Sequence, residues 1–322
     1  MDKNEIVNNV RTIRKIIREN IIPVLNDEAG LKSSEDSPKP HFSYVQQRAM
    51  INQVFASTSG DKYSVQSIML RLIVIDSLYS TNAAYSYFSF EHMANEIYDL
   101  GKEEDAADKF YRLVINYTSS GIDTLFTSPY GVRKNLAEGS RQMSLMSKYA
   151  YYVLLQCPDK YPLGFPIYDS LAINMYPEVY KNVKGTKNRK FSKAKLADTK
   201  TISIKDYIEA LNDLRVTIFG NNEKLFDGYQ QYDLLDAYLW RMGKLDKGNY
   251  SLLFIKREYE TFVKNIGLKG WKDSSADEKK QSDAFNKEVR ARCVQKDTKE
   301  ILKGLSNKCM SALINHWKDF YK

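Results

Sequence analysis

An amine and a carboxylate occupy neighbouring helical segments of this 322-residue chain. Lys148 lies in the otherwise mainly apolar stretch Met146–Ala150, and Asp169 follows 21 positions later, directly after Phe165–Tyr168. A lysine amine becomes a nucleophile when desolvation lowers its pKa, and a nearby carboxylate stabilises developing positive charge. A paired amine and carboxylate at this spacing can cut a glycosidic bond.

Both residues also have ordinary explanations. Asp169 or Ser170, after a proline-rich approach, is a good N-cap for a helix that runs through Met175. A lone lysine is typical of a solvated helix face. The two roles of Asp169 are compatible, because a capping carboxylate is held rigidly.

The composition of the chain limits which partners, metal sites and catalytic triads can be expected. The chain has 48 Lys and Arg against 40 Asp and Glu, a formal charge of +8 and a pI near 9.0. This balance favours a polyanionic partner, with nucleic acid ahead of an anionic membrane surface. The scattered cysteines and histidines predict no disulfide framework, metal site or histidine triad; they are Cys157, Cys293, Cys309, His41, His92 and His316.

The sequence motifs also predict the cellular location of the protein and its need for a cofactor. The basic first helix lacks the apolar run of a signal peptide, and no stretch is long enough to span a membrane. No phosphate-binding loop or ligand cluster indicates a nucleotide, metal or other cofactor. We therefore expect a cytoplasmic monomer without a cofactor.

Apolar residues recur at helical spacing along most of the chain, and strands have almost no support. The first helix is expected over Ile6–Val24 and is expected to end through Pro23 and Gly30. A second helical segment is expected to begin at Tyr44. Further helices are expected at residues 65–79, 90–100, 105–116, 143–157, 169–175, from 203, and at 234–242. The fold class is therefore all-α.

A basic segment follows the Asp169 helix. Residues 181–200 carry eight basic side chains and a single acid, Asp198, with little periodicity. We expect a mobile basic loop, which is either a solvated loop or a phosphate-binding surface. The candidate phosphate contacts are Lys187, Arg189, Lys190 and Lys193.

The order of these parts resembles the helix-hairpin-helix (HhH-GPD) superfamily of DNA glycosylases, particularly the bacterial and archaeal proteins similar to 8-oxoguanine glycosylase. Ile75–Asn82 is similar to a family helix that ends in polar residues, and a helix like Phe90–Leu100 follows. The Lys148 helix and Asp169 have a spacing similar to the family's. Tyr232–Trp240 resembles the closing helix of some bacterial relatives, so the likeness covers roughly residues 44–244.

This resemblance implies a role for each matching residue. Lys148 would be the amine nucleophile, which adds strand cleavage through a Schiff base, and Asp169 the catalytic carboxylate. The family's Gly-x-Gly pair before the lysine is absent, which would leave phosphate contact to Arg141 and Ser147. The residues that would probe DNA or line the pocket of a flipped base are Tyr79, Thr81, Asn82, Tyr149, Tyr152 and Tyr168.

The expected architecture is two helical lobes around a DNA-binding cleft. Residues 1–60 pack with 163–245 in one lobe, 61–162 form the central lobe, and 246–322 are a C-terminal helical extension. The resemblance implies excision of a modified base from DNA, either a hypermodified, glucosylated cytosine of phage DNA as an antiviral defence or an oxidised guanine. A non-catalytic helical DNA-binding module and a protein–protein adaptor remain alternatives.

Overall fold

The computed structural model describes residues 2–26, 44–79, 89–118, 121–130, 141–198 and 201–246. Within these residues the predicted all-α class is confirmed, because the extended pairing there is a single isolated bridge between Phe226 and Tyr229. The chain divides into two units, Met1–Trp240 and Arg241–Lys322. The helices expected beyond residue 246 lie outside the described residues.

The N-terminal helix is longer than its sequence signals indicate. It comprises α1 (Lys3–Ile16), the π-helical segment η1 (Ile17–Ile21) and α2 (Ile22–Asn26). The prediction that Pro23 closes this helix is wrong. Proline lacks an N–H and crowds the carbonyl four residues earlier, and the wider π-helical turn directly before it accommodates both effects.

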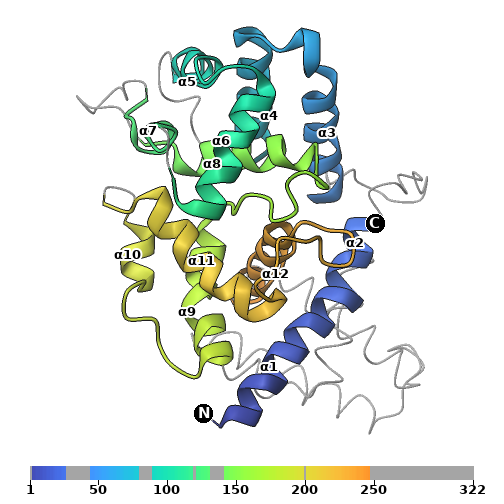
Figure 1. Ribbon diagram of the computed structural model, residues 1–322, viewed down its shortest axis with the longest axis vertical. Coiled ribbons are helices and arrows are strands. Elements are labelled where there is room, and N and C mark those ends of the chain that lie inside the picture. Colours follow the sequence, from blue (N-terminus) through green and yellow to red (C-terminus); the bar gives the residue numbers. More distant parts are fainter. Residues whose placement is uncertain are drawn as a thin grey trace, which may run out of the picture. The chain divides into compact units, whose positions relative to one another are not determined.

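Helices α3 to α8 pack around one buried helix (Figure 1). Helix α8 contacts α3, α4, α6 and α7, and its residues 145–154 are all buried. The short α7 falls in a stretch for which the sequence predicts no helix. The bounds are α3 Tyr44–Ser57, the 3-10 helix η3 Gly60–Lys62, α4 Val65–Tyr79, α5 Ser89–Tyr98, α6 Glu103–Asn116, α7 Thr124–Thr127 and α8 Met143–Leu155.

The second group of helices comprises α9 (Ser170–Lys184), α10 (Lys193–Ala197), α11 (Ile204–Phe219) and α12 (Gln231–Asp246). Helix α9 continues through Pro177 and ends at Gly185, whose φ of 75° suits a glycine C-cap. The prediction of a loop over residues 181–200 is therefore wrong in two places, because the last turn of α9 and all of α10 are helical.

The helices of the first 60 residues have different neighbours. Helix α1 packs on α9 and α11. Helix α3 packs instead on α4 and α8, and it reaches α12 through an ion pair between Arg48 and Asp233. The chain thus crosses between the two groups before residue 61.

No helix in the described ranges is both long and apolar enough to cross a membrane.

Candidate active site

Lys148 is buried on α8, with 4% of the residue exposed. Its Nζ donates to Ser144 Oγ at 2.6 Å and lies 5.2 Å from the centre of the Tyr79 ring. Burial lowers the pKa of the Lys148 amine, while the carboxylates of Asp169 and Asp236 act in the opposite direction. The amine is therefore biased towards its neutral, nucleophilic form in the company of two acids.

Asp169 is the N-cap of α9, as predicted. Its Oδ1 accepts a hydrogen bond from the Leu171 N–H at 2.6 Å, and its backbone is extended. The preceding backbone is fixed as well: the Tyr168 N–H donates to Ser147 Oγ at 2.9 Å, and Ile167 O accepts from the Tyr207 hydroxyl at 2.7 Å. The carboxylate is therefore held at a defined place, from which its charge acts on Lys148.

Asp236 on α12 completes this centre, and sequence reasoning did not single it out. Burial raises the pKa of its carboxyl well above the usual value, and the negative charge of Asp169 adds to the shift, while Lys148 opposes it. The sequence did hold a signal, since Asp233 and Asp236 lie three residues apart in the stretch Tyr232–Trp240, whose other residues are apolar or aromatic. The structure thus brings together one amine and two carboxyls from α8, α9 and α12.

A buried ion pair fixes α12 beside this centre. Arg48 donates to both carboxylate oxygens of Asp233, at 2.6 and 2.8 Å, and the Tyr151 hydroxyl donates to the same carboxylate at 2.8 Å. Arg48 and Asp233 are 3% and 2% exposed. Since Asp236 lies one turn after Asp233, this bidentate pair sets the position of the Asp236 carboxyl.

The tyrosines predicted to line the base pocket lie in different parts of the structure. The hydroxyls of Tyr79 and Tyr152 lie 2.7 Å apart, next to Lys148. Tyr149 is fully buried and packs against Phe55 and Phe110 in the core of the α3–α8 group. Tyr79 and Tyr152 are thus the predicted aromatic residues that the structure places at the centre.

The structure places Tyr168 but does not describe the predicted DNA-probing residues Thr81 and Asn82. The Tyr168 residue is 6% exposed, and its hydroxyl donates to Leu196 O of α10 at 2.7 Å, so it links elements. Thr81 and Asn82 lie outside the described residues.

The predicted phosphate contacts are spread over two surfaces and the interior. Ser147 is fully buried, and its hydroxyl donates to Ser144 O and accepts from the Tyr168 N–H, so the structure gives it an internal role. Arg141 is partly exposed just before α8. These two residues do not form an exposed phosphate site.

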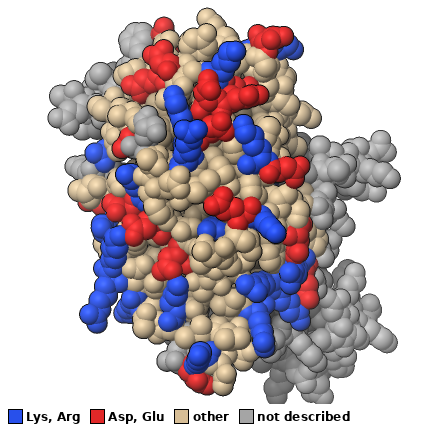
Figure 2. Space-filling model, viewed as in Figure 1, with Lys and Arg blue, Asp and Glu red and all other residues tan. Residues whose placement is uncertain are grey.

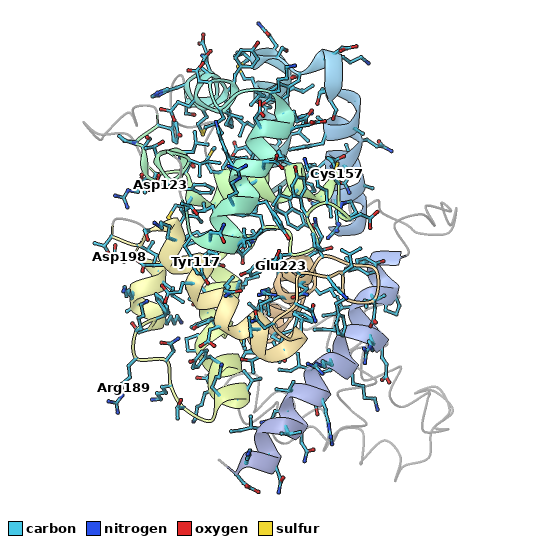
Figure 3. The ribbon with its side chains drawn as sticks, viewed as in Figure 1. Tyr117, Asp123, Cys157, Arg189, Asp198 and Glu223 are labelled. Carbon is cyan, nitrogen blue, oxygen red and sulfur yellow. The ribbon has the colours of Figure 1, made fainter. Side chains whose placement is uncertain are left out.

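The basic segment after α9 is different. Lys187, Arg189 and Lys193 are exposed and form no ion pair within the described part of the chain, and Arg189 points away from the helices (Figure 3). Lys190 pairs with Glu209. Lys and Arg side chains gather at the lower left of Figure 2, over the region where Figure 1 places α10. This segment is the exposed cationic surface nearest in sequence to Asp169.

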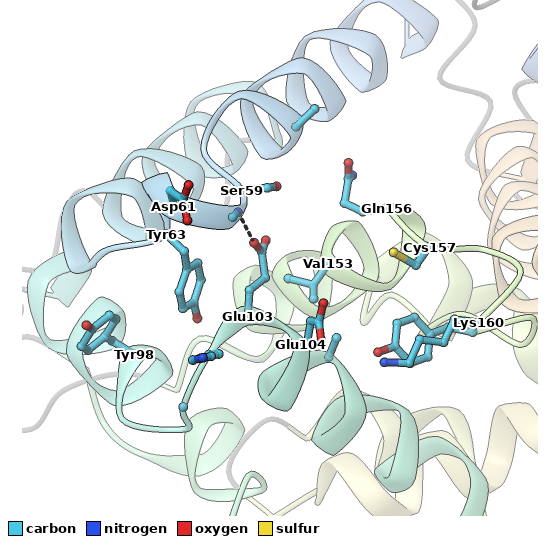
Figure 4. Close-up of a pocket in the computed structure, with 16 residues that line it drawn as sticks. Ser59, Asp61, Tyr63, Tyr98, Glu103, Glu104, Val153, Gln156, Cys157 and Lys160 are labelled. Carbon is cyan, nitrogen blue, oxygen red and sulfur yellow. Dashed lines mark hydrogen bonds between the residues drawn. The ribbon is translucent and has the colours of Figure 1, made fainter.

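A groove of about 970 Å³ lies elsewhere, between η3, α6 and the end of α8 (Figure 4). Tyr63 and Tyr98 line one end of it, and Cys157 and Lys160 line the other. Its lining includes Asp61, Glu103 and Glu104, which would repel phosphate, and it does not include Lys148, Asp169 or Asp236. Lys102 and Lys160 also line the groove, which is therefore a mixed-charge site separate from Lys148, Asp169 and Asp236.

Among the described residues, no group of three or more His, Cys, Asp or Glu side chains is placed to hold a metal ion. In comparisons with known proteins, no family model, no curated protein and no solved structure matched this chain significantly.

Proposed function

We propose that the chain is a DNA N-glycosylase that flips out and excises a modified base. The observation that carries this proposal is the buried Lys148 amine, with its lowered pKa, beside the carboxyls of Asp169 and Asp236. Strongly shifted pKa values that arise from burial together with specific charged neighbours are typical of active sites. An amine with a lowered pKa and a fixed carboxylate are groups with which a glycosidic bond can be cut.

The chemistry assigns a role to each group. The neutral Lys148 amine attacks C1′ of the deoxyribose; the new C–N bond forms as the glycosidic bond breaks, and the base leaves with a proton. Asp169 stabilises the positive charge that develops on the sugar and accepts a proton from the attacking amine. Asp236, whose carboxyl has a raised pKa, is the candidate donor of a hydrogen bond or a proton to the departing base.

Opening of the sugar ring in that adduct gives a Schiff base on Lys148, from which the strand is cleaved. A close variant uses Asp169 to activate water, in which case Lys148 supplies only charge and no strand cleavage follows. Borohydride reduces a Schiff base to a stable bond, so it traps the protein on DNA in the first variant and not in the second.

The DNA partner is supported by charge. The chain carries a formal charge of +8, and exposed lysines and arginines that lack ion pairs follow α9, the helix that Asp169 caps. Contacts of this kind to phosphates give sequence-independent affinity that falls steeply with salt. They would hold a duplex while a base is unstacked, which costs a few kcal/mol.

The substrate is part of the proposal. We favour a bulky hypermodified cytosine, such as the glucosylated cytosine of phage DNA, with cytoplasmic antiviral defence as the biological role and the monomer as the working form. Oxidised guanine is the alternative substrate. Phages with modified and unmodified DNA separate these two roles, because defence predicts lower plating of the modified phage alone.

The direct experiment is incubation of the protein with genomic DNAs of different modification status, followed by mass spectrometry of the released bases. We expect one modified base to be released and unmodified DNA to remain intact. Release of no base from any DNA would contradict the proposal.

A second candidate is a helical DNA-binding module without catalysis. It is favoured by the intramolecular partners of the two key groups, because Asp169 caps α9 and Lys148 donates to Ser144. This candidate predicts salt-dependent DNA binding with no base release, and binding unchanged by Asp169→Asn. A protein–protein adaptor would show no salt-dependent DNA binding.

A further inference from the structure

Tyr168 lies between the amine–carboxylate centre and the exposed basic segment. On the side of the centre, its N–H donates to Ser147 Oγ at 2.9 Å. Ser147 directly precedes Lys148, and Tyr168 directly precedes Asp169. The backbone of Tyr168 is therefore part of the frame that holds the amine and the carboxylate together.

The side chain of Tyr168 points to a different element. Its hydroxyl donates to Leu196 O of α10 at 2.7 Å, and its ring meets the Tyr207 ring edge-on, with centroids 4.9 Å apart. Tyr168 is 6% exposed and Leu196 is fully buried. The hydrogen bond is thus shielded from water, where it constrains α10 and Asp169 most strongly.

Helix α10 belongs to the basic segment. Its N-cap is Ser192, its first residue is Lys193, and the exposed Lys187 and Arg189 precede it. A phosphate bound by these side chains would hold the segment against the DNA backbone. The position of α10 would then influence the position of Asp169 through the hydrogen bond between the Tyr168 hydroxyl and Leu196 O.

We infer that Tyr168 is a positioning residue that couples phosphate binding on the basic segment to the placement of Asp169. This inference rests on the proposed glycosylase function and adds a regulatory link to the same site. The carboxylate would reach its productive position when a DNA backbone occupies the segment, and coupling of this kind is a free energy shared between two sites.

The test is a double-mutant cycle that combines Tyr168→Phe with the pair Lys187→Gln and Lys193→Gln. The phenylalanine keeps the ring and the backbone bond to Ser147 and removes only the bond to Leu196. The readouts are the single-turnover rate of base release at saturating DNA and, separately, the Kd for DNA.

We expect Tyr168→Phe to lower the saturated rate about tenfold while the Kd stays within about twofold. The lysine pair should weaken the Kd and also lower the saturated rate. In the Tyr168→Phe background, the lysine pair should still weaken the Kd but have no further effect on the saturated rate. Effects on the saturated rate that simply multiply would overturn the inference and leave the glycosylase proposal intact.

Tyr180→Phe is the matched control. Tyr180 also donates its hydroxyl to a partner on another helix, Asp213 at 2.9 Å, but it lies away from the link between α10 and Asp169. We expect this variant to keep the rate of the unmodified protein. A loss equal to that of Tyr168→Phe would show a general effect of removing a tyrosine hydroxyl that bridges two helices and would overturn the inference.

A second measurement needs no change at Tyr168. Hydrogen exchange at the Leu171 amide, which donates to Asp169, should slow when uncleavable DNA binds, and the lysine pair should remove this protection at saturating DNA. Equal protection with and without the two lysines would overturn the inference. If the unmodified protein binds DNA but releases no base, the proposed function fails and the inference fails with it.

Discussion

Arg71 and Lys148 are two of the buried cations in the first unit of this chain, and they have different surroundings. Arg71 on α4 and Lys148 on α8 are 0% and 4% exposed. Arg71 donates to several acceptors and is paired with one acid, Glu103. Lys148 donates to one acceptor, Ser144, and its charge interacts with the carboxyls of Asp169 and Asp236. The negative charge of Asp169 in turn raises the pKa of Asp236. Burial alone therefore does not mark a functional group; the balance of its partners does.

The Arg71 centre is satisfied. The guanidinium donates to Glu103 at 2.6 Å, to Thr58 at 2.7 Å and to Phe55 O at 2.9 Å, and it lies 4.7 Å from the centre of the Phe55 ring. A buried charge whose donors are all engaged locks its neighbours together and leaves no group free for chemistry. We interpret Arg71 as a structural tie between α3, α4 and α6.

The ionisable groups around Lys148 shift one another's pKa values in opposing directions. The Asp169 charge helps to raise the pKa of Asp236, and burial lowers the pKa of Lys148, so charged and neutral forms compete there. A fold that served stability alone would gain from replacing such groups with apolar ones. Their presence at one place fits the proposed catalytic role.

The largest expected effect is on stability, at the structural centre. Arg71→Met leaves Glu103 and Phe55 O without their donor, and we expect a loss of about 3 kcal/mol in the free energy of unfolding. Urea denaturation measures it, with the exposed Lys62→Met as control. A loss below about 1 kcal/mol would remove the contrast between the two centres.

Lys148→Met should behave differently. Because burial disfavours the charged amine and the amine has one hydrogen bond, we expect the free energy of unfolding to change by no more than about 1 kcal/mol. Borohydride trapping on DNA should disappear. In the unmodified protein, trapping should rise with pH through the lowered pKa of Lys148, because only the neutral amine attacks. Trapping that persists in Lys148→Met would remove this residue from the mechanism.

Asp236→Asn tests the second carboxyl through pH. The folded pKa of Asp236 is raised, so above the unfolded value near 4 the unfolded chain gives up this proton first, and the carboxyl destabilises the fold increasingly as pH rises to the folded pKa. The substitution should therefore stabilise the fold more at pH 8 than at pH 4. Thermal melts across this range measure it, and Asp61→Asn on exposed η3 should show no such trend.

The smallest effect concerns DNA affinity. Lys187→Gln and Lys193→Gln should each reduce the slope of log Kd against log salt by about 0.9, since each removes one phosphate contact. Lys184→Gln is a matched control, because Lys184 is already paired with Asp213 at 2.6 Å and should change the slope less. Equal slopes for all three variants would place the DNA elsewhere.

Local signals predicted much of this fold. The apolar stripe at residues 65–79 became α4, and the serine at 203 became the N-cap of α11, where its hydroxyl accepts from the Asp206 N–H. The errors arose where tertiary packing overrides local signals. Pro23 lies inside a helix because a π-helical turn precedes it, and residues 181–184 are helical because α9 packs on α1 and α11.

The candidate site was partly predictable for the same reason. Asp169 follows a local rule for helix starts, which made its N-cap role visible in the sequence. Asp236 lies 67 positions later on another helix, and only folding brings it to Lys148. Ser147 and Tyr149 are neighbours of Lys148 in sequence, but the turn of α8 directs them into the interior.

The most direct test of the central claim is base release by the unmodified protein and by Asp169→Asn, which keeps a capping side chain and removes the charge. Both proteins are incubated with glucosylated phage DNA and with oxidised DNA, free bases are measured by mass spectrometry, and DNA binding is measured in parallel. The account predicts release of one base by the unmodified protein and a loss of about 10³-fold or more in Asp169→Asn at equal DNA affinity. Equal release by both proteins, or release by neither, would contradict it.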